Sequence, residues 1–274
     1  MHEWKKWEIK KKDNLYYRGE WNEDLFKKTL VVVGSRRMTR YGREVLAKFI
    51  PDLVAQGMTI ISGFMYGIDS EAHRLTIELG GKTIAILGSG LNYLTTADND
   101  GLYTKILESG GLVISEYEPD FKATVWTFPQ RNKIVAKIAT EGILVIEAGL
   151  KSGSLITARL GWETGKKVYA VPGMIVSVTS EGCNWLIKNN RAKMVTEIGD
   201  IIGNFNSTQM EMFDVNLSKE ERKIYELLEC ESLTIDELAK KLKIESRFVS
   251  MTITNMSMKD VVKEEMGKVY LNRL

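Results

Sequence analysis

The sequence predicts an α/β protein with a Rossmann-like, doubly wound and mostly parallel sheet, followed by a small C-terminal winged-helix domain. Short apolar runs rich in Val, Ile and Leu alternate with segments of helical periodicity over most of the chain. Glycine-bearing turns follow several of these runs, as expected where a strand passes into a crossover helix. Near residue 203 the alternation stops and a pattern of amphipathic helices begins.

Six segments are expected to form the strands of the sheet. Each is short and almost continuously apolar, which is typical of strands that helices cover on both faces. The segments between them include two with a clear helical period, residues 42–57 and 154–165. Strands that alternate with helices pair in parallel, because each helix returns the chain to the end of the sheet at which the previous strand began. The expected strands are residues 30–34, 58–62, 82–87, 111–115, 142–147 and 167–171.

The pattern divides the chain into four expected parts. Residues 1–29 are an N-terminal extension that packs on the core, and residues 30–203 form the Rossmann-like domain. Residues 204–216 are polar and weakly periodic, which indicates a linker. Residues 217–274 contain three helical patterns, two of which begin with a Ser or Thr cap followed by acids, and two short strands around a Gly turn. Three helices and a hairpin predict a winged helix-turn-helix.

Composition excludes several classes of protein. The chain has 274 residues and a formal net charge of +2, so the overall charge gives no evidence for a nucleic-acid partner. No apolar stretch has the length of a signal peptide or a membrane helix, which predicts a cytoplasmic protein without membrane contact. The cysteines Cys183 and Cys230 and the histidines His2 and His73 lack the spacing of a disulfide framework or a metal site.

Glycine-bearing turns mark the expected ligand edge of the sheet. In a doubly wound sheet the turns after the strands lie at the carboxyl ends, where ligands bind. Glycine lets a phosphate approach the backbone, and the following helix offers free N–H groups. Gly153 and Ser154 form such an arrangement before a helix. No complete GxGxxG or Walker fingerprint occurs, so neither NAD nor ATP is expected as a cofactor. The other turns are residues 34–42, 62–69 and 88–93.

Two clusters of basic residues without acids predict an anion site. One lies between Ser35 and Arg43, the other between Phe121 and Thr140, and both follow expected strands of one sheet. A local field of this kind is sufficient for binding even when the net charge is small. The basic residues are Arg36, Arg37, Arg40 and Arg43 in the first cluster, and Lys122, Arg131, Lys133 and Lys137 in the second.

The second cluster also contains two aromatic residues, Trp126 and Phe128. Aromatic rings beside basic residues suit single-stranded nucleic acid, because unstacked bases offer π-faces and the backbone offers charge. Anchoring of the loop by buried rings is the competing interpretation. Asp69 and His73 are spaced for acid–base chemistry on one helix, but without a third partner we favour a helix-capping Asp and a buried, hydrogen-bonded His.

Between about residues 15 and 202 the chain contains a series of ordered motifs: VVVGSRRMTRYG, SGFMYGIDSEAH, FPQRNKIVAKIA, VIEAGLKSGSLITA, VPG and EGCNWLI. In this order they resemble the DNA-processing protein A (DprA/Smf) family. Thr95 and Thr96 stand where the family has a YP dipeptide, although Asn99 is retained. Asn190 replaces a family Gly, a mild change because Asn tolerates left-handed geometry.

The resemblance implies a non-catalytic protein that binds single-stranded DNA and helps to load RecA recombinase in natural transformation. It also implies a homodimer through the Rossmann-like domains. DNA contacts are implied for Arg36, Lys122, Phe128 and the segment 131–133, in agreement with the charge clusters. The complete expected DNA site comprises Ser35, Arg36, Arg37, Lys122, Phe128, Arg131, Asn132, Lys133, Gly153 and Ser154.

Two other functions fit parts of the pattern. A phosphoribohydrolase-like enzyme of the same superfamily would need a carboxylate soon after the glycine turn, whereas no acid follows Lys151 until Glu163. A transcription regulator would read duplex DNA with the winged helix. That module has as many acidic as basic residues, and its expected recognition helix, residues 246–258, has a single charged side chain, Arg247. We therefore expect an accessory role for the module and not independent DNA binding.

Overall fold

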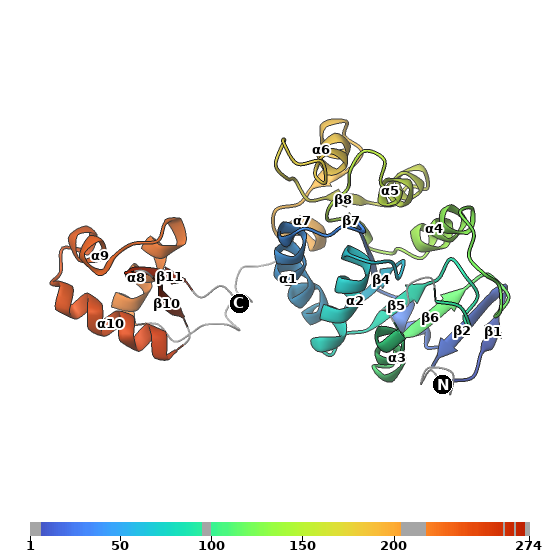
Figure 1. Cartoon of the computed structure of the whole chain (residues 1–274), viewed down its shortest axis with the longest axis horizontal. Helices are drawn as coiled ribbons and strands as arrows, with labels where there is room; N and C mark the ends of the chain where they lie inside the picture. Colours follow the sequence, from blue (N-terminus) through green and yellow to red (C-terminus); the bar gives the residue numbers. More distant parts are fainter. Residues whose placement is uncertain (1–6, 95–99, 204–217, 260, 266, 272–274) are drawn as a thin grey trace. The chain divides into compact units, whose positions relative to one another are not determined.

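The computed structural model describes residues 7–94, 100–203, 218–259, 261–265 and 267–271. The chain forms two compact units, Met1–Asn204 and Phe205–Leu274, each of which is described by itself (Figure 1). The expected linker, residues 204–216, and the segment with Thr95, Thr96 and Asn99 lie outside the described residues. In the described part of the chain, no helix has the length and apolar character needed to span a membrane.

The first unit is built on a nine-stranded sheet. Its spatial order is β1-β2-β6-β5-β4-β3-β7-β8-β9. In the part of this order that runs from β6 to β9, all neighbouring strands are parallel. The six expected strands are present as β3 to β8, which confirms the predicted α/β fold with a mostly parallel sheet. The strands are β1 (Lys10–Lys12), β2 (Leu15–Gly19), β3 (Thr29–Val33), β4 (Thr59–Ser62), β5 (Thr83–Ile86), β6 (Leu112–Ser115), β7 (Gly142–Val145), β8 (Val168–Ala170) and β9 (Lys193–Met194).

The N-terminal segment contributes strands to the sheet itself. β1 and β2 form an antiparallel hairpin, and β2 pairs antiparallel with β6. Arg18 of β2 is buried, and its guanidinium donates to the carbonyl of Leu91 at 2.6 Å and to Asn92 Oδ1 at 2.7 Å. The segment is therefore joined to the core by main-chain pairing and by a buried cation.

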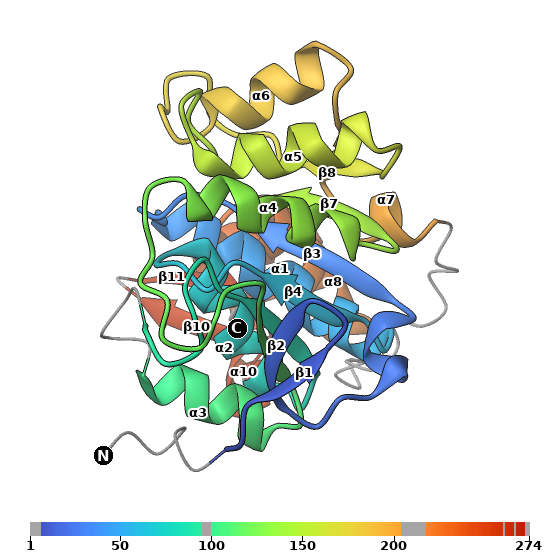
Figure 2. The same ribbon diagram turned by 90° about the vertical axis from the view of Figure 1, so that its right-hand side faces the viewer.

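Helices cover both faces of the sheet because the side chains of each strand alternate between the faces. Val31 and Val33 of β3 pack with the helices on one face, whereas Leu30 and Val32 pack with those on the other. In Figure 2, α4 and α5 lie in front of the central strands. The helices are α1 (Arg40–Ala55), α2 (Ile68–Glu78), α3 (Asp100–Glu108), α4 (Thr127–Lys137), α5 (Gly153–Glu163), α6 (Glu181–Lys188) and α7 (Gly199–Ile202), with a short 3-10 helix at Glu23–Phe26.

The strand order reverses between β3 and β7. From β3 the chain adds β4, β5 and β6 on one side, and then returns to place β7 on the other side of β3. The loops that leave β3 and β7 therefore run to opposite faces, and a crevice opens at the carboxyl ends of these two strands. In open α/β sheets, ligands bind at this switch point.

The second unit contains α8 (Lys219–Cys230), α9 (Ile235–Leu242), α10 (Ser246–Met258) and an antiparallel pair, β10 (Val262–Glu265) and β11 (Lys268–Leu271). Capping boxes begin two of the helices: Ser218 with Glu221, and Thr234 with Glu237. The apolar faces of the three helices and the hairpin share one small core. These elements agree with the helical and strand patterns of the sequence, and the winged-helix classification remains a prediction.

Leu46 of α1 tests the packing of the first unit, because its side chain is fully buried against the sheet. Leu46→Ala should lower the free energy of unfolding by about 2–5 kcal/mol, through lost burial and the cavity that remains. Leu79→Ala, at an exposed position, is the matched control and should change it by less than about 0.5 kcal/mol. Tryptophan fluorescence in a urea titration reports on this unit alone, because all 6 tryptophans precede residue 205. If the two variants lose the same free energy of unfolding, the described burial of Leu46 against the sheet is wrong.

Candidate nucleic-acid interface

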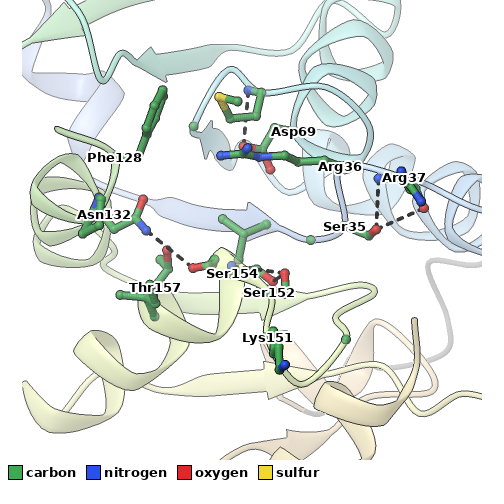
Figure 3. Close-up of a pocket in the computed structure, with 18 of the residues that line it drawn as sticks. Ser35, Arg36, Arg37, Asp69, Phe128, Asn132, Lys151, Ser152, Ser154 and Thr157 are labelled. Carbon is green, nitrogen blue, oxygen red and sulfur yellow. Dashed lines mark hydrogen bonds between the residues drawn. The ribbon is translucent and has the colours of Figure 1, made fainter. Parts of the chain in front are cut away.

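A pocket of about 1070 Å³ opens at the carboxyl ends of β3 and β7. Its wall combines the loop after β3, the loop after β4, the first turns of α4 and the N-terminus of α5 (Figure 3). It is therefore located at the switch point of the sheet.

Eight of the ten expected site residues line this pocket. The two exceptions are Lys122 and Lys133, both of which are exposed. The Lys122 ammonium lies 5.5 Å from the ring centroid of Tyr93, and Lys133 Nζ is 3.5 Å from Gln130 Oε1. The residues that line the pocket are Ser35, Arg36, Arg37, Phe128, Arg131, Asn132, Gly153 and Ser154. Their role in binding DNA remains a prediction.

The first arginine cluster is divided by the start of α1. Arg40 pairs with Glu44, and Arg43 lies 3.8 Å from a carboxylate oxygen of Glu71. Arg36 and Arg37 are exposed, line the pocket and form no ion pair with any residue that the structure describes. Within this cluster, Arg36 and Arg37 are therefore the two arginines that add uncompensated positive charge to the pocket, as far as the described residues show.

Arg36 extends across the pocket towards an aromatic ring (Figure 3). Its guanidinium carbon lies 5.6 Å from the ring centroid of Phe128. Phe128 also packs over Gly88, where an added Cβ would lie 2.9 Å from the ring. The ring is therefore supported from behind, and together with the guanidinium it forms a wall that is both apolar and cationic.

The N-terminus of α5 forms the opposite wall. Ser152 caps the helix, and its Oγ lies 2.7 Å from Ser154 Oγ. Gly153 has open space at its Cβ position, so an anion can approach the backbone there. Lys151 is exposed and lines the same wall. The positive end of a helix dipole, hydroxyl groups and a cation together suit a phosphate group.

Arg131 differs from the other basic residues of the pocket because it is buried, with 4% of its surface exposed. Its guanidinium donates to the carbonyl oxygens of Gly63 and Ile86, at the ends of β4 and β5, and to Asn132 Oδ1 at 3.1 Å. Burial lowers the pKa of Arg131 to about 10, and the group remains charged at neutral pH. Arg131 thus joins α4 to two strand ends while one side faces the pocket.

Asp69 is the buried carboxylate of the pocket wall. Its Oδ2 accepts from the backbone N–H of Met65 at 3.4 Å. Burial raises the pKa of Asp69 to about 6, although the positive charge of Arg131 opposes the rise. His73, one helical turn later, is fully buried with Nδ1 2.6 Å from Thr83 Oγ1, and burial lowers its pKa to about 3. The neutral, buried His agrees with a structural role, although its Nε2 has no hydrogen-bond partner among the described residues. The helix-capping role expected for Asp69 is wrong, because the N-cap of α2 is Gly67 and no side chain caps the helix there.

Glu147 holds the loops of the pocket together. It is buried at the end of β7, and its carboxylate accepts from the backbone N–H of Thr39 at 3.0 Å and from the Thr39 hydroxyl. The Thr179 hydroxyl lies 3.5 Å from the same carboxylate. One side chain thereby connects the loops that follow β3, β7 and β8.

Sequence reasoning missed Lys151, Ser152 and Glu147. Ser152 had a signal, because a Ser directly before Gly-Ser and an apolar helix is typical of an N-cap. Glu147 had none, since nothing local distinguishes a buried acid at a strand end from an exposed one. Elsewhere, Cys183 is buried and its thiol pKa is raised to about 12, which agrees with an unreactive thiol. Asn190 has φ 54°, the left-handed geometry that the replacement of Gly requires.

The fold and the site define a class: a Rossmann-like α/β protein with a cationic, phosphate-suited pocket at the switch point of its sheet. Residues 7–206 match the DNA recombination-mediator protein A family. The chain belongs to this family, whose members are DNA recombination mediators.

Individual relatives agree with this assignment. The chain is 42% identical to Protein Smf of Escherichia coli over 64% of its length, and 40% identical to DNA processing protein DprA of Streptococcus pneumoniae over 70%. It spans 46% and 66% of those two proteins.

Two solved structures share the fold. The crystal structure of DprA from S. pneumoniae superposes with a TM-score of 0.64 at 39% identity, over 70% of this chain and 66% of that one. The second is a structure of DNA processing protein A from Helicobacter pylori that was determined to describe its single-stranded DNA binding mode. It superposes with a TM-score of 0.62 at 27% identity, over 72% of this chain and 86% of that one.

Asp69 predicts a specific dependence of stability on pH. The folded carboxyl, with a pKa of about 6, holds a proton that the unfolded chain, with a pKa near 3.8, has already lost. The wild-type free energy of unfolding should therefore fall as the pH rises from about 4 to about 6, relative to that of Asp69→Asn, which keeps a neutral amide throughout. Urea titrations followed by tryptophan fluorescence at several pH values measure the difference. Parallel pH curves for the two proteins would contradict the assignment.

Proposed function

We propose that this protein binds single-stranded DNA in the pocket at the ends of β3 and β7. The observation that carries the proposal is the position of the Arg36 guanidinium beside the Phe128 ring, opposite the N-terminus of α5. Among the residues that the structure describes, Arg36 has no ion-pair partner. Such a wall offers a positive charge for a phosphate and a π-face for a base within one cavity. The DNA-binding H. pylori relative supports the same ligand.

The geometry favours a single strand over a duplex. The pocket is a cavity between loops, and a base can contact Phe128 only when it is unstacked and unpaired. A duplex presents its phosphates on the outside and hides the faces of its bases. We assign the phosphates to Arg36, Arg37 and the start of α5 at Gly153 and Ser154, and one base to Phe128.

Four further residues of the expected site have different roles in this proposal. Arg131 holds the ends of β4 and β5 in place and adds its charge to the field inside the pocket. Asn132 Nδ2 lies 3.5 Å from the Gly153 carbonyl and helps to position the start of α5. Lys122 and Lys133, outside the pocket, would contact the strand as it enters or leaves.

The wider role that we propose is that of a recombination mediator. Family membership and the relatives named Smf and DprA support a part in DNA processing during recombination. As the family resemblance implies, we propose that the protein loads RecA onto single-stranded DNA in natural transformation and forms a homodimer through the Rossmann-like unit. We also propose a cytoplasmic location. Co-sedimentation of the protein with RecA on single-stranded DNA coated by single-strand-binding protein tests the loading role.

Charge and stacking can be separated by two substitutions. Arg36→Ala should weaken binding of short oligonucleotides of any sequence and reduce the slope of log affinity against log salt by somewhat under one unit, because fewer counterions are released. Phe128→Leu should weaken binding by up to about tenfold and leave that slope unchanged, since it removes a π-face and no charge.

Arg40→Ala is the matched control for the lost charge, because Arg40 is exposed but paired with Glu44 on α1. Fluorescence anisotropy at several salt concentrations measures all three variants. Wild-type affinity in folded Arg36→Ala and Phe128→Leu would remove the pocket from the proposal.

The second unit has an accessory role in this proposal. Truncation after Phe213 should leave the affinity for single-stranded DNA within a few-fold of the full chain, because the pocket lies wholly in the first unit. The module 217–274 has equal numbers of acidic and basic residues and so lacks the phosphate neutralisation that duplex binding requires. A titration of the full and truncated chains with duplex DNA at physiological salt completes the test. Micromolar or tighter duplex binding that truncation abolishes would contradict the accessory role.

A further inference from the structure

The loop between β8 and α6 exposes a run of apolar side chains. Met174, Ile175, Val176 and Val178 are between 69% and 91% exposed. Single exposed apolar residues are common on protein surfaces, but four within five positions form a patch that is expected to contact a ligand or partner.

Hydrogen bonds at both ends fix this loop. The Tyr41 hydroxyl donates to the Pro172 carbonyl at 2.6 Å, and Gly173 exchanges hydrogen bonds with the Asn184 side chain at 3.1 and 3.0 Å. Thr179 faces Glu147 at the other end. Between them the Ser177 N–H donates to the Met174 carbonyl at 3.0 Å and closes a turn. The exposure is therefore a property of a well-anchored loop.

A second apolar element lies before α4. Val125 and Trp126 are 80% and 78% exposed. Val125 and Val178 both line the pocket at the switch point, so the two apolar segments meet the same cavity. We call these six residues the apolar rim: Val125, Trp126, Met174, Ile175, Val176 and Val178.

We propose that the apolar rim binds bases of single-stranded DNA on either side of the nucleotides that the pocket holds. The proposal rests on the proposed function and extends the contact with DNA beyond the pocket. Residues 123–130 and 172–180 contain no charged side chain, whereas Arg36, Arg37 and Lys151 lie inside the pocket. Phosphates would thus be held at the centre and base faces at the edge.

The chemistry of the rim fits a nucleic-acid strand better than a protein surface. A stable protein interface needs a contiguous apolar core on about 800 Å² from each partner. Here two apolar segments border one cationic cavity, whose lining also includes Glu181 and the buried Asp69. A single strand alternates base faces with negative charges, and its flexible backbone can follow such a border. Duplex DNA could not use the rim, because its bases are stacked.

The proposal predicts that the rim acts only on longer oligonucleotides that carry bases. The double variant Ile175→Ser with Val176→Ser removes the two most exposed side chains of the loop and leaves every pocket residue intact. It should bind a 20-nucleotide oligothymidine about tenfold more weakly than the wild type, and a 4-nucleotide oligothymidine equally well. The salt slope should stay unchanged, because no charge is removed.

Two controls accompany this measurement. Met258→Ser removes an equally exposed apolar side chain from α10 and should change nothing. A 20-nucleotide strand with abasic sites outside a central four-thymidine segment should bind the wild type and the double variant equally, because it lacks the bases that the rim would contact.

The outcomes separate the two proposals. Absence of binding of either oligothymidine by the wild type would overturn the proposed function. If the wild type and the double variant bind the 20-nucleotide strand tightly and with equal affinity, the proposed role of the apolar rim is wrong. The proposed DNA site in the pocket would be unaffected by this result. Loss of self-association in the double variant, measured by sedimentation, with unchanged affinity for DNA would assign the rim to a second copy of the chain and also overturn the proposal.

Discussion

The candidate site depends on the buried carboxylate of Glu147. It accepts hydrogen bonds from the backbone and hydroxyl of Thr39 and faces the hydroxyl of Thr179, so one group connects the loops after β3, β7 and β8. A buried carboxylate is costly unless its oxygens are hydrogen-bonded, and these contacts satisfy it. Without that connection the loop with Arg36 and the loop with Val178 would lose the contact that holds them to each other, although each keeps other hydrogen bonds to the core.

The pocket separates charges that support the structure from charges that can meet a ligand. Arg131 is committed to the carbonyls of Gly63 and Ile86, and its charge lies near Asp69. Arg36 has no such commitments among the described residues and can therefore bind a phosphate without breaking an internal contact. Arg131 is buried and supports the structure, so its substitution should lower the stability of the fold. Arg36 is exposed, so its substitution should lower the affinity for DNA.

The sheet could be predicted because its strands are continuous apolar runs, and such runs have few alternatives. The site was predicted less completely. Nothing in the spacing of Arg36, Arg40 and Arg43 shows that α1 begins at Arg40 and turns the later two towards Glu44 and Glu71. The burial of Arg131 depends on main-chain carbonyls distant in sequence. The hairpin of β1 and β2 was also not predicted as part of the sheet, because Lys10–Lys12 lacks apolar residues.

The same hairpin has a consequence for the behaviour of the protein at high concentration. An open sheet ends in two strands whose unpaired N–H and C=O groups can recruit another chain. Here one outer strand, β1, consists of three lysines, and the other, β9, is only the two exposed residues Lys193 and Met194. Outer strands this short offer a second copy little backbone to pair with. The nine-stranded sheet is thereby protected against edge-to-edge aggregation, although its central strands are among the most apolar segments of the chain.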